Sequence, residues 1–339
     1  MITRSKAPLR LGLAGGGTDV SPFCDVYGGA VLNATISLYA YCTIEDLNNN
    51  EIIFNALDFE VKEQFLTSDL LNDEGLRLHR GVYRRIVRDF LNNTPPPISI
   101  ATFCDAPPGS GLGSSSTLVV AMLHAYVEHF NLPLGEYDIA HLAYEIERVD
   151  LKLDGGKQDQ YAAAFGGVNF MEFYDNDKVI VNPLRIRPQT LAELESSLVL
   201  FYTGVSRDSD KIIQDQIQVT STNKNNLDAM KDIKDMAFVM KEHILKGNIK
   251  GFAECLVHSW QSKKKTSTKV SNLNIDKIYN DVMQLGAYAG KVSGAGGGGF
   301  MMFIVDFSKK LEIIRYLERQ EGYVMRCHFS HDGAHAWRV

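Results

Sequence analysis

The chain has 339 residues, of which 45% are hydrophobic and 22% are charged, the balance of a globular protein with a large core. This length exceeds what one core usually supports, so two domains are expected. The formal net charge of -6 argues against a dedicated nucleic-acid binder or a protein of the membrane surface.

The five cysteines are widely spaced and never form a CxxC pair, so neither a disulfide framework nor a zinc site is expected. Residues 1–8 hold no apolar signal region, and no stretch approaches the roughly 20 apolar residues of a membrane helix. We therefore expect a soluble protein of the reducing cytoplasm, a monomer or homodimer that binds neither nucleic acid nor membrane.

The first part of the chain is predicted to be rich in β-structure. Residues 4–14 alternate enough to form a strand, and the three glycines that follow place Thr18 and Asp19 on a tight loop, where a turn or capping role is the alternative for Asp19. Residues 30–46 and 51–65 are rich in β-branched and aromatic residues and predict an antiparallel meander.

A glycine-rich loop precedes the helix that begins near Ser114. Gly109, Gly111 and Gly113 allow sharp turns and close approach of a ligand, and the helix N-terminus supplies unpaired N–H groups that favour an anion. No lysine precedes the serines, as a Walker A loop requires, and Ser114 stands where a dinucleotide fingerprint has its third glycine. A glycine turn with a serine-capped helix is the alternative for this stretch.

Two acidic residues follow on predicted helices. Helical spacing over 136–150 places Glu147 beside the core-facing side of its helix. A loop dense in glycine and charge then leads to Asp159, which is expected at a helix start, with a capping role as the alternative.

The best boundary lies near Pro188, which predicts domains over 1–187 and 188–339. The second domain begins with a strand and continues with mostly helical residues, whose basic end at Lys263 to Lys265 is expected to be solvated. A glycine run then precedes a strand, a helix and a final strand, an order that resembles half of a ferredoxin-like α+β sandwich; these segments span 294–299, 300–305, 308–320 and 323–329.

Three separated segments, Ala7 to Asp19, Pro107 to Ser116 and Lys291 to Phe300, together resemble the GHMP small-molecule kinases. This resemblance spans nearly the whole chain. It implies an α+β GHMP kinase fold with an N-terminal ribosomal-protein-S5-like α/β domain and a C-terminal ferredoxin-like α+β domain. Within the family, residues 6–19 and 201–207 are similar to the heptose 7-phosphate kinases, and the fucokinase domains are the nearest competitors.

The resemblance implies an ATP site and a Mg²⁺ site. Magnesium is expected between Ser115 and a helix glutamate, for which Glu147 is the first choice and Glu145 the fallback. A hydroxyl, one carboxylate and phosphate oxygens suit this hard cation. The residues expected to hold the nucleotide are Pro108, Gly109, Ser110, Gly111, Leu112, Gly113, Ser114, Ser115 and Ser116.

The resemblance also implies a sugar site. Asp159 would take the proton of an anomeric hydroxyl, and Arg10 beside it would stabilise the ionised carboxylate and the charge that develops during transfer. Galactokinases have Glu-His where this chain has two glycines, which argues against galactose. The residues expected to bind the sugar are Gly16, Gly17, Thr18, Asp19, Gly294, Gly296, Gly297 and Arg207.

The implied activity is the ATP- and Mg²⁺-dependent phosphorylation of the anomeric hydroxyl of D-glycero-D-manno-heptose 7-phosphate, in the biosynthesis of nucleotide-activated heptose. The alternatives are a fucose-type kinase of an unphosphorylated sugar and a non-catalytic sensor of nucleotide and sugar. The 7-phosphate needs its own cation, for which Lys6, Arg207 and Lys211 are candidates, with solvated surface as the alternative for each.

The C-terminal cluster of His328, His331, Asp332 and His335 is not expected to bind a metal. It falls in a terminal strand and the following loop, where alternation sends successive side chains to different faces.

Overall fold

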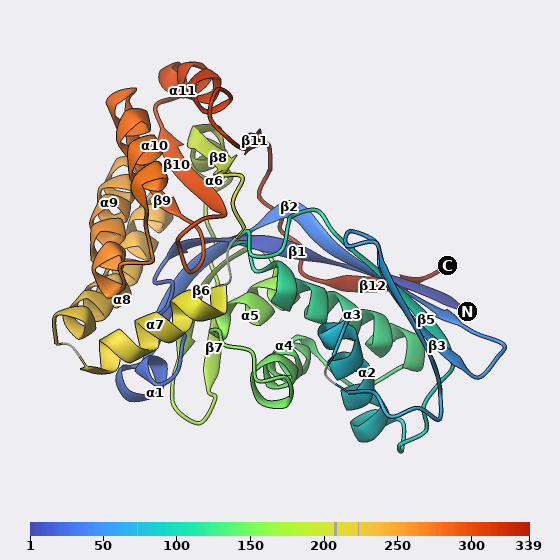
Figure 1. Ribbon diagram of the computed structural model, residues 1–339. Helices are drawn as coiled ribbons and strands as arrows, with labels where there is room; N and C mark the ends of the chain where they lie inside the picture. The colour runs from blue at the N-terminus through green and yellow to red at the C-terminus, as the bar shows by residue number, and fades with distance from the viewer. Residues whose placement is uncertain (73, 207–208, 223) are drawn as a thin grey trace.

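The computed structural model describes residues 1–72, 74–206, 209–222 and 224–339. It has two β-sheets with helices packed against them (Figure 1). The first sheet has the strand order β12-β1-β2-β5-β3-β4, with β6 and β7 attached through β2. None of the described helices is long and apolar enough to cross a membrane.

The long strand β2 is the centre of the first sheet. Its beginning pairs with β6 and its end pairs with β5, while β1 runs beside both parts. The strands of this sheet are β1 (Ile2–Ala14), β2 (Gly29–Asp46), β3 (Glu51–Ala56), β4 (Val61–Leu66), β5 (Ile98–Cys104), β6 (Val168–Phe173), β7 (Val179–Pro183) and β12 (His335–Arg338).

The predicted meander over the first strands is wrong, because β5 inserts between β2 and β3 and pairs parallel with β3. Apolar alternation identifies a strand but does not name its partner. The segment between β4 and β5 makes the crossover that a parallel pair requires, and it contains α2 (Arg77–Phe90).

Helices α3 and α5 pack against β1 and β2 in the first half of the chain. The α3 residues 118–123 are apolar and buried without interruption, as expected of a helix enclosed on all sides. The elements of this half are α1 (Phe23–Tyr27), α3 (Ser114–Phe130), α4 (Glu136–Glu145), the π-helical turn η1 (Ile146–Asp150) and α5 (Gln158–Phe165).

The second sheet is antiparallel, with the order β11-β8-β10-β9. Every residue of β10 is buried, because Met302 shares an apolar core with Leu9, whereas Phe303 shares another with Ile278 of α10. The expected ferredoxin-like α+β arrangement is therefore confirmed. Its strands are β8 (Leu198–Tyr202), β9 (Ala287–Val292), β10 (Phe300–Val305) and β11 (Tyr323–Met325).

The helices of the second half surround this sheet. Helix α9 packs on α8 and on β9, which places its last turns beside the loops that leave β1 and β9. These elements are α6 (Pro188–Ser197), α7 (Ser209–Thr222), α8 (Lys224–Lys246), α9 (Ile249–Thr266), α10 (Leu273–Gln284), the 3-10 turn η2 (Phe307–Lys309) and α11 (Lys310–Leu317).

The end of the chain returns to the first sheet. Strand β12 pairs with β1, and the N–H of Val339 donates to the carbonyl of Ile2 at 3.0 Å, so the two termini lie side by side (Figure 1). The final strand expected over 323–329 is present as β11, but it ends earlier, at Met325. The division into domains 1–187 and 188–339 stays a prediction.

Candidate active site

One pocket lies where the loops after β1, β5 and β9 meet the starts of α3 and α5. Its walls come from both halves of the chain. Of the residues expected at the nucleotide, metal and sugar sites, it is lined by Arg10, Gly16, Gly17, Asp19, Gly109, Gly111, Gly113, Ser114, Ser115, Ser116, Glu147, Asp159 and Gly294.

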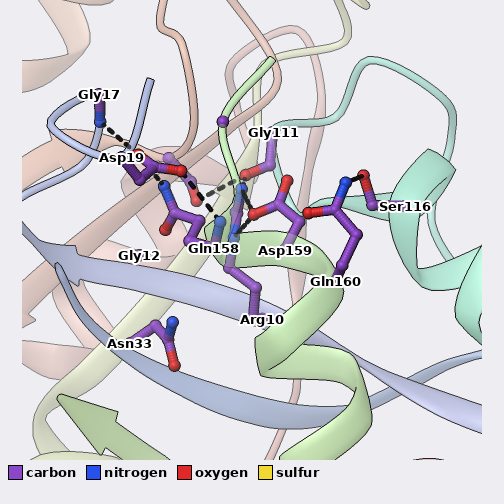
Figure 2. Close-up of polar contacts among 12 residues, drawn as sticks. Arg10, Gly12, Gly17, Asp19, Asn33, Gly111, Ser116, Gln158, Asp159 and Gln160 are labelled. Atoms are coloured by element: carbon purple, nitrogen blue, oxygen red, sulfur yellow. Dashed lines mark hydrogen bonds and ion pairs between the residues drawn. The ribbon is translucent and has the colours of Figure 1, made fainter. Parts of the chain in front are cut away.

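Arg10 of β1 joins Asp159 to the glycine loop before α3 (Figure 2). Its Nε and Nη2 atoms both lie 2.6 Å from Oδ1 of Asp159, and its Nη1 atom donates to the carbonyl of Gly111 at 2.6 Å. The Arg10 side chain is 5% exposed, and that of Asp159 is 21% exposed. The guanidinium has its donors fixed in one plane and can make these contacts together. It therefore fixes the position of the Asp159 carboxylate relative to the glycine loop.

Asp19 is bound to the same helix that carries Asp159. Its Oδ2 atom accepts the N–H of Gln158 at 3.0 Å, and its Oδ1 atom accepts the Gln158 amide at 3.1 Å and the N–H of Gly17 at 3.2 Å (Figure 2). Thr18 does not line the pocket: its hydroxyl donates to the carbonyl of Gly15 at 2.8 Å and is buried. Thr18 therefore shapes the loop that presents Asp19.

Ser115 and Glu147 meet at the N-terminus of α3. The Ser115 hydroxyl donates to Oε1 of Glu147 at 3.3 Å, and Gln160 donates to Oε2 at 2.6 Å and to the hydroxyl of Ser116 at 3.1 Å. Glu147 is 1% exposed and lies in η1, where the wider π turn replaces the expected α-helix; such turns are frequent at functional sites. Glu145 instead pairs with Arg85 and does not line the pocket.

The two glycine loops touch backbone to backbone. The Ser293 hydroxyl donates to the carbonyl of Gly111 at 2.8 Å, and the N–H of Phe300 donates to the carbonyl of Ser110 at 2.8 Å. Gly111 has φ +81° and Gly294 has φ +73°, and a Cβ on Gly294 would lie 2.8 Å from the Cα of Gly111. Glycine is required at both positions for its backbone conformation and for this close approach.

Other residues of the two loops support them from behind. The N–H of Gly297 donates to the carbonyl of Val270 at 2.7 Å, and a Cβ on Gly296 would lie 2.6 Å from that same carbonyl oxygen. Ser110 and Leu112 are fully buried. The expected residues that do not line the pocket are Thr18, Pro108, Ser110, Leu112, Gly296 and Gly297.

Two lysines, Lys263 and the partly buried Lys291, also line the pocket. The expectation that Lys263 is solvated is wrong: it is 8% exposed, and its Nζ atom donates to the carbonyl of Gly16 at 3.0 Å. Burial lowers the pKa of Lys263 to about 8, although the Asp19 carboxylate acts in the opposite direction. Helical spacing after Phe252 and Leu256, which puts Lys263 on the apolar face of α9, was the signal for its burial.

The second lysine, Lys291 of β9, stands at the start of the third family segment and was not among the residues expected at the site. Its Nζ atom donates to the carbonyl of Gly12 at 2.7 Å. Burial lowers the pKa of Lys291 to about 7, and repulsion from Lys263 and Arg10 adds to this shift. The pocket therefore holds a concentration of positive charge next to Arg10.

Two of the three candidates for the 7-phosphate cation do not line this pocket. The Lys6 ammonium lies 4.6 Å from the ring centre of Tyr39, and neither Lys6 nor Lys211 is among the described residues that line the pocket. Arg207 lies outside the described residues. In the C-terminal cluster, His328 pairs with Glu195 at 2.8 Å, and no group of three potential His, Cys, Asp or Glu metal ligands occurs in the described part of the chain.

Comparison with known proteins gives a consistent result. Residues 77–167 match the GHMP kinases N terminal domain, and residues 240–324 match the GHMP kinases C terminal model. The chain is 48% identical to the D-glycero-alpha-D-manno-heptose 7-phosphate kinase of Campylobacter jejuni, over 99% of both chains.

Two further relatives cover most of the chain. A crystal structure of a D-glycero-D-manno-heptose 1-phosphate kinase from Bacteroides thetaiotaomicron superposes with a TM-score of 0.85 at 48% identity, over 99% of both chains. A bifunctional fucokinase/GDP-fucose pyrophosphorylase from Arabidopsis thaliana is 25% identical over 92% of this chain and 31% of its own length. With both family models matched and 48% identity along almost its entire length, the chain belongs to the GHMP kinase family.

Proposed function

We propose that this GHMP kinase transfers the γ-phosphoryl group of ATP to the anomeric hydroxyl of D-glycero-D-manno-heptose 7-phosphate. The observation that carries the proposal is a single pocket in which the Arg10–Asp159 pair lies with Ser115 and Glu147. This arrangement combines a base for a hydroxyl with oxygen donors at a helix N-terminus, the parts that phosphoryl transfer needs. The named relative with 48% identity supports a heptose phosphate as the substrate.

The names of the two heptose kinases differ in the position of the phosphate. A 7-phosphate leaves the anomeric hydroxyl free to react, whereas a 1-phosphate occupies that oxygen. Because Asp159 is proposed to act on the anomeric hydroxyl, the 7-phosphate is the substrate consistent with this site. The product is the 1,7-bisphosphate, which supplies the anomeric phosphate that nucleotide activation of a heptose requires.

In the proposed mechanism, Asp159 accepts the proton of the anomeric hydroxyl as its oxygen attacks the γ-phosphorus. The bond from that phosphorus to the bridging oxygen breaks, and ADP leaves with the bonding electrons. A positioned base contributes typically ~10²–10⁴-fold to such a step. Arg10 fixes the carboxylate against the glycine loop and supplies positive charge beside the reacting groups.

The α3 N-terminus and the preceding loop are proposed to bind the triphosphate. Gly109, Gly111 and Gly113 line the pocket together with Ser114, Ser115 and Ser116. Three of these residues begin α3, where unpaired N–H groups and the helix dipole favour phosphate.

Mg²⁺ fits between Ser115 and Glu147. The two side chains provide a hydroxyl and a buried carboxylate within 3.3 Å of each other, and oxygen donors of this kind suit a hard cation that also binds phosphate oxygens and water. When bound, Mg²⁺ neutralises charge on the phosphate oxygens during transfer. We further propose that the protein acts in the cytoplasm, where its five cysteines, all free in the structure, stay reduced.

An ATP-consumption assay with a panel of acceptors tests the proposed function. The panel contains D-glycero-D-manno-heptose 7-phosphate, the corresponding 1-phosphate, the free heptose, L-fucose and D-galactose. We expect kcat/KM to be highest for the 7-phosphate, with a product that carries phosphate on the anomeric oxygen. Robust turnover of free fucose without turnover of the 7-phosphate would instead establish the fucose-type alternative.

A further inference from the structure

One end of the pocket is formed by Gly16, Gly17, Asp19 and Lys263. The Lys263 ammonium lies 3.0 Å from the carbonyl of Gly16 and 3.4 Å from the side-chain oxygen of Gln216. Asp159, by contrast, lies with Arg10 beside the nucleotide loop. A ligand that spans from Asp159 past Asp19 therefore meets Lys263 at its far end.

The space beside Gly16 is open, whereas Gly17 lies directly against Lys263. A Cβ built on Gly16 has no atom within 4 Å, whereas a Cβ on Gly17 would lie 2.8 Å from the Lys263 ammonium. Any side chain at residue 17 would compete with the ammonium for its place. The two glycines thus keep this end of the pocket clear for Lys263 and for whatever group it binds.

The positive charge of Lys263 is poorly compensated in this pocket. Its Nζ atom has three donors, and its hydrogen bonds within the described chain go to one carbonyl and one amide oxygen, while the Asp19 carboxylate acts on it without a hydrogen bond between the two side chains. Asp19 already accepts three N–H groups from Gly17 and Gln158. A buried ammonium that shares its only nearby carboxylate with three other donors is costly, so this end of the pocket favours an anionic ligand.

Two neighbouring residues strengthen this conclusion. Trp260, one turn earlier on α9, lines the same pocket, and its buried indole N–H has no hydrogen-bond partner in the described part of the chain. Lys291 adds a second ammonium to the pocket, and desolvation together with repulsion from Lys263 lowers the pKa of Lys291. The Trp260 N–H supplies a free donor for an oxygen atom, and the charge of Lys291 favours an anion over a neutral hydroxyl.

We propose that Lys263 binds the 7-phosphate of the sugar and selects the phosphorylated substrate over the free heptose. This inference rests on the proposed function. In a heptose 7-phosphate the anomeric oxygen and the phosphate are at opposite ends of the carbon chain, and the pocket has Asp159 and Lys263 in a matching order, with Asp19 between them. Lys263 is thus a specificity-determining residue. It was not among Lys6, Arg207 and Lys211, the cations expected from the sequence to bind the 7-phosphate.

The test compares Lys263→Met with Lys265→Met, a matched change of an exposed lysine on the same helix. Each variant is assayed with heptose 7-phosphate and with free heptose, at saturating ATP. For Lys263→Met, we expect KM for the 7-phosphate to rise by roughly 10- to 100-fold, as for the loss of a charged hydrogen bond, with kcat/KM for free heptose within about threefold of the wild type. Lys265→Met should leave KM and kcat/KM unchanged for both substrates.

Lys263→Arg provides a second variant if the methionine variant does not fold. It keeps the charge, so it should retain most of the preference for the phosphorylated sugar, and an unchanged KM for ATP shows that the nucleotide site is intact. An equal loss of kcat/KM for both sugars in Lys263→Met would overturn the inference, as would an unchanged KM for the 7-phosphate. A wild type that does not phosphorylate heptose 7-phosphate at all would instead refute the proposed function itself.

Discussion

Arg10 directs two N–H groups at the same oxygen of Asp159, Oδ1, and so leaves Oδ2 of that carboxylate without a bond from the guanidinium. One oxygen is used for positioning while the other is available to a substrate hydroxyl. This division of roles fits a general base that must be held in place and still accept a proton.

Asp159→Asn should therefore reduce kcat by roughly 10²- to 10⁴-fold, because a neutral amide cannot accept the proton. ATP binding should change little, since the nucleotide loop keeps its own contacts. Steady-state kinetics and calorimetric titration with ATP measure the two effects. A variant that retains more than about a tenth of the wild-type kcat would contradict the proposed role of Asp159 as the base.

Much of this site could be predicted from the sequence, because it is built from short segments in which particular residues are required. Arg10 and Asp159 are far apart in the chain, yet the family resemblance predicted that they lie side by side. In the structure, Nε of Arg10 donates to Oδ1 of Asp159 at 2.6 Å. The glycine loops were also predictable, since Gly111 and Gly294 need backbone conformations and a close approach that other residues disfavour.

The parts that sequence reasoning missed depend on tertiary contacts. Lys263 was read as part of a basic helix end, but α9 packs on β9 and buries it against the loop after β1. Strand β12 was missed because a four-residue exposed strand has little apolar pattern of its own, and it forms only by pairing with β1. The order of β2, β5 and β3 likewise follows from a crossover that local alternation does not encode.

Glu147→Gln should raise the Mg²⁺ concentration needed for half-maximal activity by about tenfold or more, because it removes the carboxylate charge proposed to hold the ion. Glu145→Gln is the matched control, since Glu145 pairs with Arg85 outside the pocket. That control should lower stability slightly while leaving the Mg²⁺ dependence unchanged. The assay is a Mg²⁺ titration at fixed ATP, and the reverse result would assign the metal to Glu145.

Gly294→Ala should lower the free energy of unfolding by about 2 kcal/mol, because the new Cβ would sit on a backbone with φ +73° and 2.8 Å from the Cα of Gly111. The movement of the loops should also raise KM for ATP. Gly16→Ala, where a Cβ meets no atom within 4 Å, is the stability control. Denaturant unfolding of the three proteins measures the difference, and equal stability of the two variants would disprove the packing argument.

The affinity for the phosphorylated sugar should fall as the pH rises. Burial lowers the pKa of Lys263 to about 8, so the ammonium is mostly charged below this pH and mostly neutral above it. One pH unit above this value leaves roughly a tenth of the lysine charged, which predicts about a tenfold higher KM for heptose 7-phosphate at pH 9 than at pH 7. The substrate cannot cause the change, because a phosphate monoester has its second pKa near ~6 and stays a dianion throughout this range.

The charged groups around Lys263 also influence this titration. Asp19 raises the pKa of Lys263, whereas repulsion links Lys263 to Lys291, whose own pKa of about 7 is also influenced by Arg10. The measurement is KM for heptose 7-phosphate between pH 6.5 and 9.5 at constant ionic strength, for the wild type and for Lys263→Met. In Lys263→Met the rise in KM between pH 7 and 9 should largely disappear. If the wild-type KM stays flat across this range, a charged Lys263 is not what holds the phosphate.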